Sequence, residues 1–286
     1  MRRDPLRIAL QVGVYGILCW FMMGLAGWLL GSLGPLAGTT LGVLAAALAV
    51  NWLALRIYHG LGVGDAGLHW TSASARHLGL GVLGGVGTAC LVLAPPLVVG
   101  AARIAATPGE EYGSAAFVTL ILAVGAVGEE LLFRGYGFQL LLGSLGAWAT
   151  IAPVSVLFAA AHASNPSANW MGLANTAGFG MAFGYALFRS RDLWLPIGLH
   201  FGWNFALPLF GVNVSGLRIK VTGYSMRWSA GALWSGGEYG PEASILASLA
   251  LVVLGVWLWK APLRPQPSAL LDPPVEGAPC ASPPPS

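Results

Sequence analysis

Six polar residues stand within long apolar stretches of the chain, and their types suit hydrolysis. They are, in chain order, Glu129, Glu130, Arg134, His162, His200 and Asn204. An ionisable side chain at membrane depth is costly unless it is paired or hydrated, so such residues are functional candidates by default.

Helical spacing predicts how these residues are directed. Glu130 and Arg134 are four residues apart, so they share one face of a helix and can pair. Glu129 lies about 100° around the same helix and is free to point elsewhere. His200 and Asn204 have the same four-residue spacing and project together.

Phe158 lies one turn before His162 and can pack against its ring. Three helices that each carry a polar face will bury those faces against one another. The sequence thus predicts one polar cavity that holds a free carboxylate, two imidazoles, an amide and a Glu–Arg pair.

Two kinds of chemistry fit such a cavity. A carboxylate and an imidazole can hold and deprotonate a water molecule, while a second imidazole and an amide donate to a developing oxyanion. One Glu with two His is also a familiar ligand set for a catalytic divalent metal, such as zinc, that keeps a water. The residues alone leave both open.

The three motifs EExxxR, FxxxH and HxxxN, in this order on successive apolar segments, resemble the CPBP family of intramembrane endopeptidases. This is the Abi or CAAX-protease group, which includes the type II CAAX prenyl endopeptidase. The resemblance covers about residues 115–211.

The resemblance implies roles for the motif residues. Glu129 matches the catalytic glutamate, and His162 matches its water-binding partner. His200 and Asn204 match the pair that stabilises the oxyanion.

Glu130 and Arg134 match the supporting acid and base of the first motif. If the reaction is metal-dependent, the implied ligands are Glu129, His162 and His200. A metal-free glutamate mechanism is the favoured one for the prenyl endopeptidase.

Composition indicates where these elements lie. The chain has 286 residues, of which 9% are charged and 56% hydrophobic, whereas about 25% are charged in an average soluble domain. We therefore expect a polytopic membrane protein and exclude a soluble enzyme fold. Nucleic-acid binding is also excluded, because the net charge is only +3 and no basic run is long enough.

The predicted fold is all-α, a polytopic membrane helix bundle with about eight transmembrane helices. The expected spans are residues 8–30, 36–55, 78–102, 115–142, 147–163, 170–188, 193–211 and 244–259. Lys and Arg are more frequent in the connecting segments on the same side of the membrane as the N-terminus. This distribution predicts that both termini are cytoplasmic.

We expect a single transmembrane domain over residues 1–260, with the motif-bearing core at about 115–211. A polar loop at about 212–243 is predicted to be a lid or an interfacial hairpin. Residues 261–286 hold nine of the 19 prolines and are predicted to be a disordered tail.

The predicted function is therefore that of an intramembrane endopeptidase. Its expected partners are the lipid bilayer and a membrane-protein or peptide substrate. The Gly- and Ala-rich composition favours a bacterial plasma membrane as its location. The alternative is a non-enzymatic membrane immunity factor or scaffold that retains the polar cavity.

Overall fold

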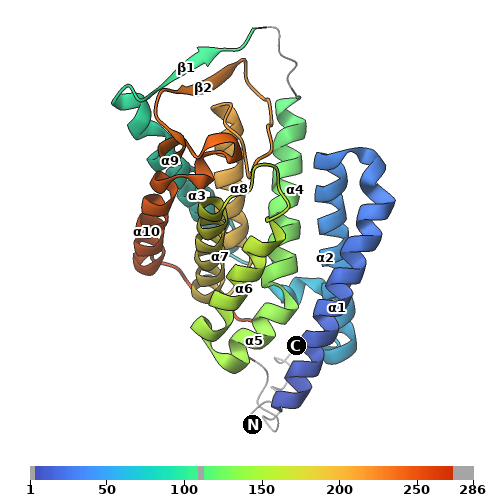
Figure 1. The fold of residues 1–286 in the computed structure, drawn as a ribbon. Helices are drawn as coiled ribbons and strands as arrows, with labels where there is room; N and C mark the ends of the chain where they lie inside the picture. Colours follow the sequence, from blue (N-terminus) through green and yellow to red (C-terminus); the bar gives the residue numbers. More distant parts are fainter. Residues whose placement is uncertain (1–3, 109–112, 273–286) are drawn as a thin grey trace.

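The computed structural model describes residues 4–108 and 113–272, and it is built mostly from helices (Figure 1). The α-helices are α1 (Pro5–Leu30), α2 (Pro35–His59), α3 (Ser74–Val98), α4 (Ala115–Arg134), α5 (Tyr136–Leu145), α6 (Ala147–Ala161), α7 (Trp170–Ser190), α8 (Trp194–Leu209), α9 (Ala232–Ser235) and α10 (Ile245–Lys260). Short 3-10 turns are η1 (Gly31–Leu33), η2 (Val63–Ala66), η3 (Gly237–Tyr239) and η4 (Pro241–Ala243).

The all-α prediction needs one correction, since the chain also forms a small antiparallel sheet. Strands β1 (Ala102–Ala106) and β2 (Tyr224–Trp228) pair with Ala102 opposite Trp228. The predicted third span ran to residue 102, but α3 ends at Val98 and the chain turns into β1. The ribbon lies at one end of the bundle (Figure 1).

Four helical segments in the described part of the chain are long and apolar enough to cross a membrane. They are Pro5–Leu33, Leu36–His59, Ser74–Val98 and Ala115–Arg134. Two further apolar helices, α6 and α10, are shorter. The prediction of a helical membrane bundle agrees with this pattern, while the number of eight spans stays a prediction.

The predicted span 115–142 is wrong, because it is two helices that meet at Gly135. Asn51, fully buried on α2, hydrogen-bonds to backbone groups on both sides of the break. Its Oδ1 accepts from the Tyr136 backbone N–H at 2.7 Å, and its Nδ2 donates to the Leu131 carbonyl at 3.0 Å. A side chain distant in sequence therefore sets where α4 ends, just after the first motif.

Helices α3 and α8 approach closely through glycines. A methyl group added at Gly85 of α3 would overlap the carbonyl oxygen of Leu199, and one at Gly202 of α8 would overlap Val82. Small residues let helix backbones meet in this way in membrane bundles. The contact determines the depth of α8, and hence of His200, in the bundle.

The outer surface of the bundle is apolar. Trp20 and Trp28 of α1 are each 80% exposed, and Val252 of α10 is 67% exposed. Helices α1 and α2 lie together on one side of α4, with α10 on the far side of the bundle (Figure 1). Such a surface suits contact with lipid rather than water.

The predicted tail differs from expectation over residues 261–272. These residues form no helix or strand, but the Gln266 N–H donates to the Ser190 carbonyl at 2.8 Å and Leu270 is 1% exposed. Arg191 pairs with Asp272 at 2.5 Å. Proline prevents regular structure but not packing of an extended segment, which explains the difference. The rest of the tail, 273–286, lies outside the described residues.

Candidate active site

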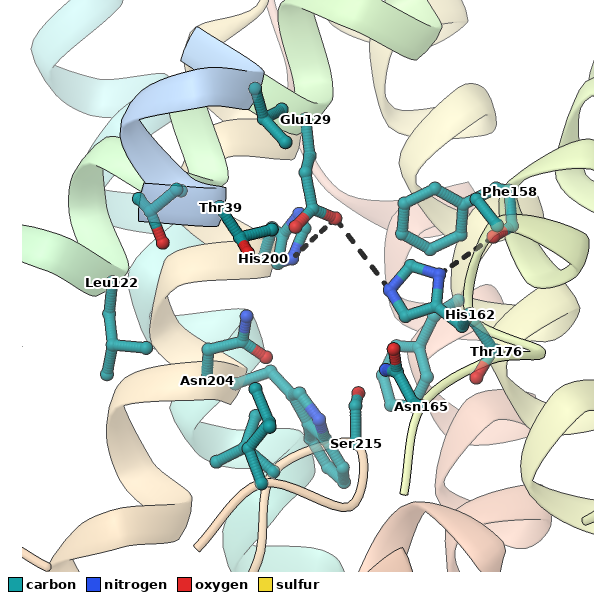
Figure 2. A pocket seen from close by; sticks show the side chains of 18 of the residues that line it. Thr39, Leu122, Glu129, Phe158, His162, Asn165, Thr176, His200, Asn204 and Ser215 are labelled. Atoms are coloured by element: carbon teal, nitrogen blue, oxygen red, sulfur yellow. Dashed lines mark hydrogen bonds and ion pairs between the residues drawn. The ribbon is translucent and has the colours of Figure 1, made fainter. Parts of the chain in front are cut away.

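Four of the six predicted residues line one cavity of about 460 Å³. Glu129 stands near the end of α4, His162 caps the C-terminus of α6, and His200 and Asn204 lie on α8. Figure 2 shows the Glu129 carboxylate directed between the two imidazoles, with Asn204 across the space. The cavity expected from the sequence is therefore present, and it gathers all three motifs.

In the described part of the protein, the Glu129 carboxylate makes only long ion-pair contacts with the two imidazoles. Its Oε2 lies 3.8 Å from His162 Nε2 and 3.9 Å from His200 Nε2, and this oxygen makes no hydrogen bond. These separations exceed a direct hydrogen bond. The three atoms are close enough together for one water molecule to hydrogen-bond to more than one of them.

Both imidazoles are held through their other nitrogen. Nδ1 of His162 lies 2.8 Å from the Phe158 carbonyl, which only accepts, so this nitrogen is the protonated donor. Nδ1 of His200 lies 2.8 Å from Glu130 Oε1, and the His200 ring stacks on Phe183 at 5.0 Å. Each Nε2 is thereby directed into the cavity.

Glu130 and Arg134 form the predicted ion pair beneath the cavity. The Arg134 Nη1 donates to Glu130 Oε1 at 3.2 Å, and the two side chains are 1% and 0% exposed. Its Nη2 donates to the Gly180 carbonyl at 3.1 Å, and its Cζ lies 4.5 Å from the Phe158 ring centroid. The same carboxylate oxygen thus serves both the guanidinium and the His200 imidazole.

The predicted ligand set does not form a metal site as it is arranged. Residues 4–108 and 113–272 contain no group of three or more His, Cys, Asp or Glu that could hold a metal ion. Ligand atoms around a tetrahedral zinc lie about 3.3 Å from one another, whereas Glu129 Oε2 lies 3.8 and 3.9 Å from the two Nε2 atoms.

Sequence reasoning missed the wall of the cavity opposite Glu129. Ser215 and Glu242, both from the loop at 212–243, line the same cavity, and Glu242 is 5% exposed. Burial raises the pKa of Glu242, and hydrogen bonds from Trp203 and Ser215 partly offset this. The sequence marked this loop only as a polar segment, predicted to be a lid or an interfacial hairpin.

The fold and site define a class, a helical membrane protein with a buried carboxylate–imidazole cavity. Residues 111–206 match the family model described as type II CAAX prenyl endopeptidase Rce1-like. This match agrees with the resemblance carried by the three motifs. The match spans all six motif residues and indicates a membrane peptidase. No significant match to a curated protein or to a solved structure was found.

Proposed function

We propose that this protein is an intramembrane endopeptidase that hydrolyses a peptide bond of a membrane-associated protein or peptide. One observation carries the proposal. The Oε2 atom of Glu129 makes no hydrogen bond, and it lies 3.8 Å from His162 Nε2 and 3.9 Å from His200 Nε2. A carboxylate and a neutral imidazole nitrogen can together accept both protons of one water, which directs its lone pair towards a carbonyl carbon.

In the proposed first step, Glu129 takes a proton from the water as its oxygen bonds to the peptide carbonyl carbon. His162 orients this water through Nε2, because its Nδ1 donates to Phe158. The carbonyl oxygen becomes an oxyanion. In the second step the carbon–nitrogen bond breaks, and Glu129 returns the proton to the leaving amine, so that protons balance.

His200 and Asn204 are proposed to stabilise the oxyanion. To donate from Nε2 while Nδ1 donates to Glu130, His200 carries a proton on both nitrogens. Glu130, itself paired with Arg134, holds this imidazolium in place. Donors aimed at a developing oxyanion are worth about 10²–10³-fold in rate each.

The location and partners follow the same proposal. The apolar outer surface and the family match support a membrane location, and we propose a bacterial plasma membrane with both termini cytoplasmic. The start of α1 and residues 261–272 lie at the same end of the bundle (Figure 1), as this topology requires. No observation favours the alternative of a non-enzymatic immunity factor or scaffold.

The test compares membranes from cells that express wild-type protein or Glu129→Gln at equal levels. Protein termini are mapped by mass spectrometry, and we expect new termini only with the wild type. Identical termini in both samples would refute the proposal. Purified protein with the identified substrate is then treated with a chelator, and unchanged cleavage is expected. Loss of cleavage that zinc restores would instead assign Glu129, His162 and His200 to a metal.

A further inference from the structure

Glu242 is a buried acid that the proposed reaction does not use. It is 5% exposed, yet its carboxylate accepts three hydrogen bonds. Oε1 accepts from Trp203 Nε1 at 3.1 Å and from the Ser215 hydroxyl at 3.1 Å. Oε2 accepts from the Ser215 backbone N–H. A buried carboxylate is costly unless it is hydrogen-bonded in this way. The three donors around this position therefore suit a Glu side chain, which can accept all three hydrogen bonds.

The Ser215 donors belong to a tight turn, residues 214–217, at the cavity wall. Val214 and Leu217 exchange backbone hydrogen bonds at 2.9 and 2.8 Å. The two residues between them, Ser215 and Gly216, both have left-handed backbones, with φ of 47° and 83°. A serine in this conformation costs about 1–2 kcal/mol. Bonds from outside the turn hold it there.

The segment that carries Glu242 is itself fixed to α7. Asn175 Nδ2 donates to the Glu242 carbonyl at 2.7 Å and to the Ser244 carbonyl at 3.0 Å. Tyr239 is fully buried, and its carbonyl accepts from the Gly216 N–H at 2.7 Å. Glu242 therefore stands on a rigid base, and the turn is tied to that base.

Trp203 links this anchor to the proposed oxyanion pair. It is 2% exposed and precedes Asn204 directly on α8. Trp203, Ser215 and Glu242 all line the cavity into which Asn204 projects, and Figure 2 shows Ser215 and Asn204 on the side opposite Glu129.

We propose that Glu242 is a positioning residue that ties the 214–217 turn to α8, and so sets the cavity wall facing Glu129. This role rests on the proposed peptidase function, because the wall would hold the peptide and keep Asn204 aimed at its carbonyl oxygen. Burial raises the pKa of Glu242, in keeping with a structural place away from solvent.

The test is Glu242→Gln, with Glu238→Gln as the matched control. Glu238 lies in the same loop but is exposed. In Glu242→Gln an NH₂ group replaces one of the two carboxylate oxygens. In one orientation it faces the Ser215 backbone N–H, and in the other it faces the Trp203 N–H and the Ser215 hydroxyl. A donor then faces a donor in either orientation. A hydrogen bond to a charged group is worth about 1.5–3 kcal/mol, or about tenfold to a hundredfold in an equilibrium.

Two readouts separate positioning from general folding. The first is kcat/KM on the substrate that terminus mapping identifies, which we expect to fall about tenfold or more in Glu242→Gln. The second is amide hydrogen exchange in peptides covering 212–217, which should become faster by about tenfold. Glu238→Gln should leave both within about twofold of wild type.

Either of two results would overturn the role. They are a Glu242→Gln protein that cleaves like wild type, and one whose exchange in the turn is unchanged. If Glu242→Gln does not fold, Ser215→Ala decides, because it removes one donor and keeps the backbone N–H. A fall in kcat/KM of about threefold or more supports the role, and a smaller one refutes it. A wild-type protein that cleaves nothing refutes the proposed function itself, which is a distinct outcome.

Discussion

The two adjacent glutamates of the first motif should respond differently to the same substitution, one losing activity alone and the other losing stability as well. Glu129→Gln is expected to abolish cleavage and leave the bundle as stable as wild type. Glu130→Gln is expected to destabilise the bundle and to reduce cleavage through His200. The contrast follows from what each carboxylate touches.

The magnitudes come from burial and distance. Glu129 is 29% exposed and its two nearest nitrogen atoms lie 3.8 and 3.9 Å away, so its loss should change stability by no more than about 1 kcal/mol. Loss of a general base costs about 10²–10⁴-fold in rate. Glu130 is fully buried against Arg134 at 3.2 Å, and leaving that guanidinium uncompensated should cost about 3–5 kcal/mol.

The assay measures cleavage rate and thermal unfolding of both variants in the same detergent or lipid nanodiscs. We expect Glu129→Gln to unfold at the wild-type temperature and Glu130→Gln to unfold several degrees lower. The reasoning would be refuted by a Glu129→Gln protein that still cleaves, or by a Glu130→Gln protein as stable as wild type. The first result removes the proposed base, and the second removes the buried ion pair as a source of stability.

Three further substitutions test the scaffold. Gly85→Ala should displace α8 and lower cleavage about tenfold or more. Gly87→Ala is the control and should not lower cleavage, because its added methyl group meets nothing within 4 Å. Equal activity of the two variants would refute the close α3–α8 contact. Asn51→Leu removes the buried hydrogen bonds of the Asn51 amide, including those to the Leu131 carbonyl and the Tyr136 N–H, and should lower the free energy of unfolding by about 2–5 kcal/mol, as measured by denaturation. Because burial raises the pKa of Glu242, the folded state binds its proton more tightly, so stability should fall as pH rises from the usual glutamate pKa through the raised one. Glu242→Gln should flatten that slope in unfolding measured against pH, and an unchanged slope would contradict the assignment.

The candidate site could be predicted from sequence because its signals are local. A polar residue within a long apolar stretch stands out without any knowledge of the fold, and the four-residue spacing of Glu130 and Arg134 fixes their pairing within one helix. The same reasoning failed where long-range contacts decide. The helix break at Gly135 depends on Asn51, which is far away in the chain.

The wall of the cavity is the clearest case of what sequence could not show. Glu242 follows glycines and a proline in a polar loop, and nothing in that pattern marks it as buried. It becomes buried only because the loop folds back onto the bundle, where Asn175 donates to the Glu242 carbonyl and Trp203 donates to its carboxylate.

By itself, the sequence determined that the protein is a helical membrane protein and which six residues are candidates for its chemistry, since hydropathy and helical spacing are properties of neighbouring residues. Only the tertiary structure decided that Glu129 Oε2 stands between two imidazole nitrogens, 3.8 and 3.9 Å away. Those distances are between residues on three different helices. The positions of these helices in the bundle depend on glycine contacts and buried hydrogen bonds between segments far apart in the chain. Cooperative packing of this kind has no signature in any single stretch of sequence.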